Sequence, residues 1–402
     1  MAGKIGKLSL GLIIILGVIW VAIGPDWRAF VANPPLNKDV LFWTEKQRDI
    51  GFRMIDRIDF IVKSRVIKAG TKTMALNAGK PLPSGLDVEA YMKANSVSGL
   101  VVLQDGQLRL EKYGLDFSSD GRWTSFSVAK SLTSTLVGAA IKDGYIKSLD
   151  ANVADYIEGL KGSAYDGVTI EQLLTMSSGV AWNEDYSDPK SDVAQYGLHV
   201  PDDGFNPIVS YMRKLPRAHP AGDVWNYSSG ETNMIGILVT EATGKILSDY
   251  ASEKIWAVYG MEADATWLLD GEGEEISGCC IQASTRDFAR LGQFIMDGAK
   301  VEGQSIVPED WMSLATQRHF DLNGRSYGYG YQWWIYENGA FGARGIFGQS
   351  IYIDPKRNLV IATNSNWDDA RGSSKGQNAR RDAFHQSVVD LIDAESHKES
   401  SD

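Results

Sequence analysis

The chain has 402 residues, enough for one large two-lobed domain or two to three smaller ones, which excludes a small disulfide scaffold. A hydrophobic fraction of 44% and a charged fraction of 23% are those of an ordinary globular protein rather than of a disordered one. Forty Lys and Arg residues against 51 Asp and Glu give a net charge of −11, which argues against a nucleic-acid partner because a phosphate binder needs a basic face.

The N-terminal stretch from Leu8 to Gly24 follows two lysines and contains no charged residue. As a helix it would span roughly 25 Å, which is short for a membrane span and long for a signal-peptide core. Ala22 and Gly24 are the only suitable small pair for signal peptidase, and they would place Pro25 directly after the cut. We therefore predict an uncleaved membrane anchor over residues 1–24, with the rest of the chain facing the periplasm or exterior. The alternative is a cleaved signal peptide and a secreted or periplasmic protein.

Residues 25–84 are predicted to form an N-terminal extension that lies on the main domain. A helical stretch in it begins at Thr44, where Gln47 three residues later predicts a capping box. A segment rich in proline then marks the start of the catalytic domain, which we place at residues 85–392. Residues 393–402 are acidic and polar, and we expect them to be a disordered tail.

The catalytic domain opens with two β-rich runs joined by Asp105–Gly106, a dipeptide that readily adopts the positive φ angles of a two-residue hairpin turn. Apolar residues at helical spacing predict helices over residues 127–146, 228–245 and 284–298. A second hairpin is predicted over residues 350–363. Short turns between strands do not permit parallel crossovers, so the sequence predicts an α+β fold: an antiparallel sheet flanked by helices, plus a mainly helical lobe.

Several known catalytic motifs are absent from the sequence. There is no G-x-S-x-G elbow, no H-E-x-x-H and no G-x-x-x-x-G-K-[ST], so an α/β-hydrolase, a zincin and a P-loop enzyme lose their main support. The five histidines lie apart from one another and from any cysteine, and we predict no metal and no cofactor. Cys279 and Cys280 are adjacent, and we expect free thiols because bonding neighbours requires a strained ring.

The chemical signal that remains is Ser127-Val128-Ala129-Lys130. Residues three apart share a helix face, so Nζ of Lys130 can reach Oγ of Ser127. A buried lysine loses its proton more easily, and the neutral amine can take the serine proton. The helix N-terminus adds free N–H groups that favour a developing oxyanion. The same spacing recurs at Ser187–Lys190, but there it lies in a polar loop with a proline before the lysine.

Three ordered segments, SFSVAKS at 125–131, NYSSG at 226–230 and RGIFGQ at 344–349, resemble the motifs of the serine β-lactamase and penicillin-binding-protein superfamily. The resemblance runs from roughly residue 85 to 391. It is closest to class C enzymes and to their esterase and 6-aminohexanoate-dimer hydrolase (nylon-oligomer hydrolase) relatives. It implies a β-lactamase/transpeptidase-like fold.

The resemblance also implies roles for single residues. Ser127 would be the acylated nucleophile, Lys130 its partner, and Tyr227 the proton relay to the leaving group. The phenol of Tyr227 can act in this way only if the nearby Lys130 lowers its pKa from about 10. The backbone N–H groups of Ser127 and Ile346 would form the oxyanion hole. Tyr186 resembles a second tyrosine that nylon-oligomer hydrolases bring over the substrate amide.

Two positions depart from the β-lactamase pattern. The third motif is usually K-T-G or H-x-G, and here it is Ala343-Arg344-Gly345, so the cation that holds a carboxylate is missing or displaced onto Arg344. Ser229 replaces the usual Asn of the second motif. Both changes weaken a β-lactamase assignment, and we expect Ser229, Arg344 and Gly345 to lie at the substrate. An acidic loop, Glu184–Asp188, could meet a cationic substrate end or could simply be solvated.

We therefore predict a serine hydrolase that cleaves an ester or amide bond of a small molecule through an acyl-enzyme on Ser127. One alternative is a D,D-peptidase or β-lactamase that acts on cell-wall peptides or β-lactams. The other is a binding module that kept the fold and lost the chemistry. The presence of Ser127, Lys130 and Tyr227 favours an enzyme over this last alternative.

Overall fold

The computed structural model describes residues 14, 17–35, 37, 40–322, 324 and 326–399. Residues 1–13, 15 and 16 of the predicted anchor lie outside this set. Among the helices of the described residues, none combines the length and the apolar character that crossing a membrane requires. The anchor over residues 1–24 stays a prediction.

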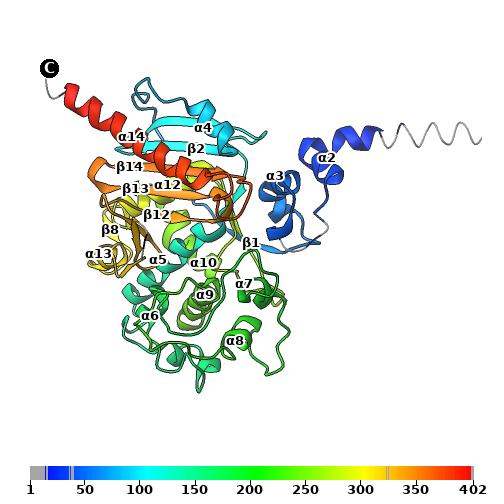
Figure 1. The fold of residues 1–402 in the computed structure, drawn as a ribbon, viewed down its shortest axis with the longest axis vertical. Coiled ribbons are helices and arrows are strands. Elements are labelled where there is room, and N and C mark those ends of the chain that lie inside the picture. The colour runs from blue at the N-terminus through cyan, green and yellow to red at the C-terminus, as the bar shows by residue number, and fades with distance from the viewer. Residues whose placement is uncertain are drawn as a thin grey trace, which may run out of the picture.

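An antiparallel sheet forms the centre of the molecule. Within the described chain it has eight strands, in the order β3-β2-β14-β13-β12-β11-β10-β9 (Figure 1). The strands are β2 (Val97–Gln104), β3 (Gln107–Tyr113), β9 (Phe320–Asp321), β10 (Tyr327–Tyr329), β11 (Trp334–Tyr336), β12 (Phe341–Arg344), β13 (Ser350–Asp354) and β14 (Leu359–Ser365). Both predicted hairpins are present, β2–β3 and β13–β14, and Asp105 and Gly106 turn the first with φ angles of 51° and 72°. The predicted α+β fold is confirmed.

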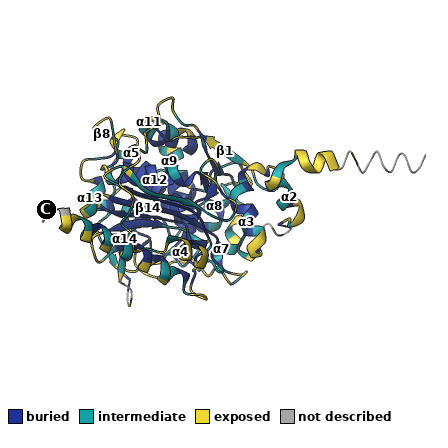
Figure 2. Cartoon of the chain, turned by 90° about the horizontal axis from the view of Figure 1, so that it is seen from above, coloured by how far each residue is buried: buried dark blue, intermediate teal, exposed yellow. Residues whose placement is uncertain are grey.

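Helices cover both faces of this sheet: α4 (Val88–Ala94), α5 (Ala129–Lys142), α12 (Thr285–Met296) and α14 (Gln377–Glu399). Successive strand residues point to opposite faces and so enter different cores. Leu100 and Val102 pack with Phe384 of α14 on one face. Val101 and Leu103 belong to the larger core on the other face, which includes α5 and α12. Figure 2 shows the strands around β14 as buried interior.

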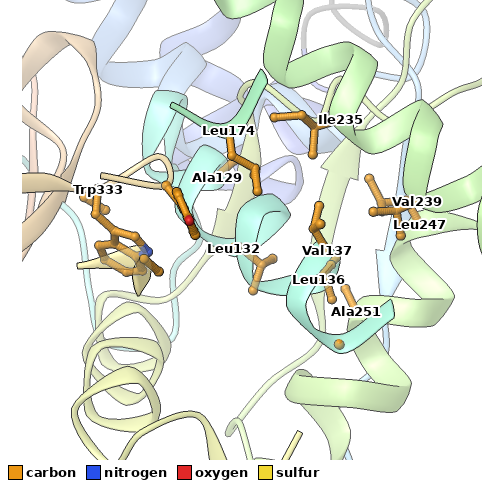
Figure 3. Packing of buried hydrophobic residues seen from close by; sticks show 14 of the residues in the cluster. Ala129, Leu132, Leu136, Val137, Leu174, Ile235, Val239, Leu247, Ala251 and Trp333 are labelled. Carbon is orange, nitrogen blue, oxygen red and sulfur yellow. The ribbon is translucent and has the colours of Figure 1, made fainter. Parts of the chain in front are cut away.

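A mainly helical lobe lies beside the sheet (Figure 1). Its helices are α6 (Ile170–Leu174), α7 (Asp192–Gln195), α8 (Pro207–Met212), α9 (Ser229–Thr243), α10 (Leu247–Ala251) and α11 (Ala257–Tyr259), and α13 (Trp311–Ala315) follows further along the chain. Figure 3 shows α5 beside α9, with Leu132, Leu136 and Val137 in the same apolar cluster as Ile235 and Val239 of α9. Because residues 129–140 of α5 are all buried, the helix is a rigid support for whatever stands at its N-terminus.

The N-terminal extension contributes to a second sheet. Its strands, in the order β1-β5-β6-β4, are β1 (Ser64–Ile67), β5 (Ala265–Leu268), β6 (Ile281–Ala283) and β4 (Trp123–Thr124); a separate short pair is β7 (Lys300–Val301) with β8 (Gln304–Ser305). The helices of the extension, α2 (Gly24–Ala32) and α3 (Glu45–Met54), lie to one side of the body in Figure 1. The capping box of Thr44 and Gln47 at the start of α3 is confirmed.

The C-terminal segment differs from the prediction of a disordered tail. Residues 393–399 continue α14 as helix. Arg357 pairs with Asp393 at 2.6 Å, and Arg109 pairs with Glu395 at 2.6 Å. The prediction was wrong because it judged the local polarity of the segment, whereas cations from distant strands stabilise these acidic residues on the helix.

Candidate active site

Ser127 lies in a 3₁₀ turn, η3 (Phe126–Val128), between β4 and α5. Strand β4 pairs with β6, which fixes the chain just before the turn. After the turn, Ser131 of α5 donates a hydrogen bond to the carbonyl of Gln332 at 2.7 Å. Ser127 is 8% exposed and opens into a cavity of about 980 Å³. A hydroxyl group is therefore held at the end of a buried helix and faces an open pocket.

Lys130 is fully enclosed below this cavity, with 1% of its surface exposed. Its Nζ donates to Ser229 Oγ at 3.0 Å and to the carbonyl of Gly278 at 2.6 Å. Within the described residues no hydrogen bond joins Nζ directly to Ser127. Burial lowers the pKa of Lys130 to about 8, and the negative charge of Glu184 acts in the opposite direction. Near neutral pH, part of the population therefore carries a neutral amine.

Tyr227 places its hydroxyl at the nucleophile. It shares a hydrogen bond with Ser127, and Lys130 Nζ lies 5.4 Å from the centroid of its ring. Burial and then the charge of Glu184 raise the pKa of Tyr227 well above its ordinary value, while the hydrogen bond with Ser127 acts in the opposite direction. A lowered pKa was the condition stated for a relay role, and in the resting site this condition is not met because desolvation of the phenol dominates. The phenol is a protonated hydroxyl in the resting site.

The carboxylate of Glu184 points inward from the loop that precedes α7. Its Oε1 accepts from Ser229 Oγ at 2.5 Å and from Tyr186 OH at 2.8 Å. Its Oε2 accepts from Ser229 N at 3.0 Å and from Trp182 Nε1. Sequence reasoning placed Glu184 with the acidic residues of its loop and missed these contacts. The neighbouring Asp185 behaves as a loop residue, because it accepts from the backbone and side chain of Ser187.

The end of β12 closely approaches the nucleophile. A Cβ atom on Gly345 would lie 2.6 Å from Ser125 O and 3.1 Å from Ser127 N, so only glycine allows this approach. Ile346 follows in η8 (Ile346–Gly348) and lines the same cavity as Ser127. The third motif thus lies beside the first.

Arg344 stands in the cavity wall between aromatic rings. Its guanidinium carbon lies 4.7 Å from the ring centroid of Tyr327 and 4.8 Å from that of Tyr336. Its Nε donates to the hydroxyl of Tyr336 at 3.0 Å, and its Nη2 pairs with Asp382 at 3.4 Å. The site therefore has a fixed cation that differs in chemistry from the lysine or histidine usual at the neighbouring position of the motif.

The structure brings the expected residues to one place. Those that line the cavity are Ser127, Tyr186, Tyr227, Arg344, Gly345 and Ile346, while Lys130 and Ser229 lie in contact beneath it. Further lining residues that sequence reasoning missed are Trp225, Trp334, Trp367, Arg371 and Arg381. They come from separate segments that carry no motif, so only the fold identifies them. In the described part of the chain, no cluster of three His, Cys, Asp or Glu side chains could hold a metal ion.

The two cysteines differ from the expectation of free thiols. Cys279 and Cys280 form a disulfide between adjacent residues. The backbone of Cys280 adopts a φ of 73°, a left-handed conformation that is uncommon in residues other than glycine. The disulfide directly follows Gly278, the residue whose carbonyl accepts from Lys130.

Comparison with known proteins shows the family of this chain. The sequence model of the family described as Beta-lactamase matches residues 87–385. A 6-aminohexanoate-dimer hydrolase of Paenarthrobacter ureafaciens is 30% identical over 299 residues, which cover 70% of this chain and 76% of the relative. A solved structure of a Bacillus anthracis protein, provisionally named a 6-aminohexanoate-dimer hydrolase, is 24% identical and superposes with a TM-score of 0.73 over 88% of this chain and 95% of the other. A family VIII carboxylesterase has a TM-score of 0.61 at 17% identity, covering 78% and 99% of the two chains.

Proposed function

Because the chain belongs to the β-lactamase family, we propose that it is a serine hydrolase that cleaves an ester or amide bond through a covalent acyl-enzyme on Ser127. The observation that carries the proposal is the buried amine of Lys130, next to a serine that opens into the cavity. A lysine whose pKa is lowered to about 8 can serve as a base near neutral pH.

In the acylation step, the neutral amine of Lys130 takes the proton of Ser127 Oγ, and Oγ attacks the substrate carbonyl carbon. The carbonyl oxygen becomes an oxyanion between the backbone N–H groups of Ser127 and Ile346. When the bond to the leaving group breaks, the Tyr227 hydroxyl protonates the departing nitrogen or oxygen, and the ammonium of Lys130 returns a proton to Tyr227. Burial raises the pKa of Tyr227, so its hydroxyl is protonated in the resting site, and the ammonium formed on Lys130 favours release of that proton. Water then attacks the ester on Ser127 by the reverse transfers.

The cavity is lined by three arginines and by three acidic residues, Glu184, Asp185 and Asp382, and we assign the arginines to an anionic group of a small-molecule substrate. Arg344, Arg371 and Arg381 line it together with several aromatic rings. A guanidinium group binds a carboxylate in a two-point geometry, and aromatic walls shield an apolar chain. The relative named 6-aminohexanoate-dimer hydrolase supports the amide as one of the two bond types.

Substitution of the nucleophile tests the proposal. Ser127→Ala should abolish turnover of a p-nitrophenyl ester, and mass spectrometry of the wild-type protein with a fluorophosphonate should place the adduct on Ser127. Retained ester turnover in Ser127→Ala, or an adduct on another residue, would refute the assignment.

A second candidate function is hydrolysis of β-lactams or D-amino-acid peptides, which the position of Arg344 at the cavity favours as a carboxylate anchor. Turnover of a chromogenic cephalosporin at a rate comparable with that of the best ester would select this function. Slow or absent cephalosporin turnover beside efficient ester or amide cleavage would select the first one.

A further inference from the structure

The chemistry proposed above assigns no role to Glu184. We propose that Glu184 is a positioning residue for the base: it fixes the direction of the Ser229 hydroxyl, and this hydroxyl in turn orients the amine of Lys130 toward Ser127. This inference rests on the proposed acyl-enzyme mechanism and adds to it a hydrogen-bonded chain from the loop before α7 to the base.

Glu184 accepts hydrogen bonds and donates none. Its two oxygens receive four donors: the backbone N–H and hydroxyl of Ser229, the hydroxyl of Tyr186 and the indole N–H of Trp182. An ionised carboxylate is the acceptor that satisfies such a set. Because both of its oxygens engage Ser229, the carboxylate also holds that residue in place at the start of α9.

The hydroxyl of Ser229 has one proton, and it gives this proton to Glu184 Oε1 at 2.5 Å. Toward Lys130 the same oxygen can therefore act only as an acceptor, at 3.0 Å from Nζ. An asparagine, usual at this position in the family pattern, brings its own carbonyl as a fixed acceptor. A serine hydroxyl can rotate, so it needs a partner that determines where its proton points, and Glu184 is that partner.

The second contact of Lys130 is also an acceptor, the carbonyl of Gly278 at 2.6 Å. A neutral amine has two N–H bonds and one lone pair. With both N–H bonds directed at Ser229 Oγ and Gly278 O, the lone pair is the one position on the nitrogen left for the proton of Ser127. The amine is thus prepared to accept the proton of the nucleophile.

The charged and titratable groups around Lys130 are few. Glu184 faces it from the loop before α7, and Tyr227 faces it from the segment that precedes α9. On α9 itself, Glu231 is occupied by Ser178 and Tyr165. The residues after Gly278 are the disulfide-bonded cysteines, which do not titrate. The pKa of Lys130 should therefore respond most directly to a change of charge at Glu184.

The test measures ester hydrolysis against pH for the full chain and four variants. Glu184→Gln should lower kcat on the alkaline plateau roughly 10- to 100-fold, because a misaligned base is costly. It should also move the acid limb of kcat/KM, near pH 8 in the wild type, to lower pH, since the anion that favours the lysine ammonium is gone. Ser229→Ala should lower kcat by a similar factor and leave the limb in place, because the carboxylate stays. Ser229→Thr keeps the hydroxyl and should retain most of kcat.

The fourth variant combines Glu184→Gln with Ser229→Ala. If Glu184 acts through Ser229, this double variant loses no more plateau activity than Ser229→Ala alone. Three results would each overturn the proposal. They are a loss of kcat in the double variant equal to the product of the two single losses, an acid limb of kcat/KM that stays in place in Glu184→Gln, and equal losses of kcat in Ser229→Thr and Ser229→Ala. Should Glu184→Gln not fold, the Thr and Ala pair still tests the Ser229 hydroxyl through which Glu184 is proposed to act, and equal losses in the two would overturn the proposal. Glu158→Gln, a glutamate whose side chain is 87% exposed, is the charge-matched control and should behave as wild type.

These outcomes are separable from failure of the proposed function. If Ser127→Ala still hydrolyses the ester, the acyl-enzyme mechanism itself is refuted. If Ser127→Ala is inactive and the losses in the double variant multiply, only the role of Glu184 is refuted.

Discussion

The ring of Phe52, in the N-terminal extension, packs against the ring of Phe126 with 5.0 Å between their centroids. Its centroid also lies 5.4 Å from that of Phe347. Phe126 directly precedes Ser127, and Phe347 directly follows Ile346. Both phenylalanines adopt positive φ angles, 41° and 57°, a conformation that costs energy in a residue with a side chain. The extension thus supports both strained segments that we propose hold the oxyanion.

Phe52→Ala is expected to reduce the free energy of unfolding by about 3–5 kcal/mol, because Phe52 is completely buried. It should also lower kcat for a p-nitrophenyl ester, since the two N–H groups of the oxyanion hole lose a common support. Denaturant unfolding and steady-state kinetics measure the two effects. Phe60→Ala is the control from the same extension, because the Phe60 side chain is 76% exposed, and it should change either quantity little. A stable Phe52→Ala protein with full activity would contradict the role of the extension.

Lys130→Met should reduce kcat at least 10²-fold, the usual contribution of a positioned base. Its effect on stability should depend on pH. Because burial lowers the pKa of Lys130 from 10.5 to about 8, the unfolded chain binds this proton more readily than the folded one between these values. Below pH 8, burial of the charged amine therefore destabilises the folded wild type by about 3 kcal/mol. This destabilisation disappears as the pH rises to 10.5. Unfolding of both proteins at pH 7 and pH 10 should show the relative stability of Lys130→Met falling with pH; a constant difference would contradict this expectation.

Tyr227→Phe should impair amide cleavage more than ester cleavage. An amine leaving group needs a proton from the Tyr227 hydroxyl, whereas p-nitrophenolate departs without one. The informative measurement is the ratio of kcat for a p-nitrophenyl ester and for the matching alkyl amide, in wild type and variant. An equal loss on both substrates would exclude Tyr227 as the donor to the leaving group.

Arg344→Gln should raise KM for substrates that carry a carboxylate, with a loss of roughly 10- to 100-fold in kcat/KM, as for a charge-assisted hydrogen bond. An uncharged ester of the same length should be affected much less. The matched substrates serve as each other's control. A uniform loss on both would show that Arg344 only stabilises the aromatic wall of Tyr327 and Tyr336.

Local sequence patterns predicted those features of the molecule that depend on residues close together in the sequence. The Asp105–Gly106 turn, the capping box at Thr44 and the buried helix that carries Lys130 all follow from residues within a few positions of one another. The three family motifs added which distant segments meet. Together they predicted the fold class and those residues of the cavity that lie in or near the motifs.

Three of the errors share one cause, which is dependence on a partner far away in the sequence. Desolvation around Tyr227 comes from the whole fold, so its pKa could not be inferred from the nearby lysine motif. Glu184 stood in a run of acidic residues, and only the approach of Ser229 shows that it points inward. The helical tail requires Arg109 and Arg357, which lie in or beside strands that precede it by many residues.

The position of β1 has a consequence for engineering by recombination. Strand β1 pairs with β5 in the sheet whose strand β4 leads into the turn of Ser127, yet it lies before residue 87, where the family match begins. An exchange of catalytic domains with a relative at that boundary would join a foreign edge strand and a foreign counterpart of Phe52 to this nucleophile. Crossover points placed before Thr44 would keep the sheet and its aromatic support as one inherited unit.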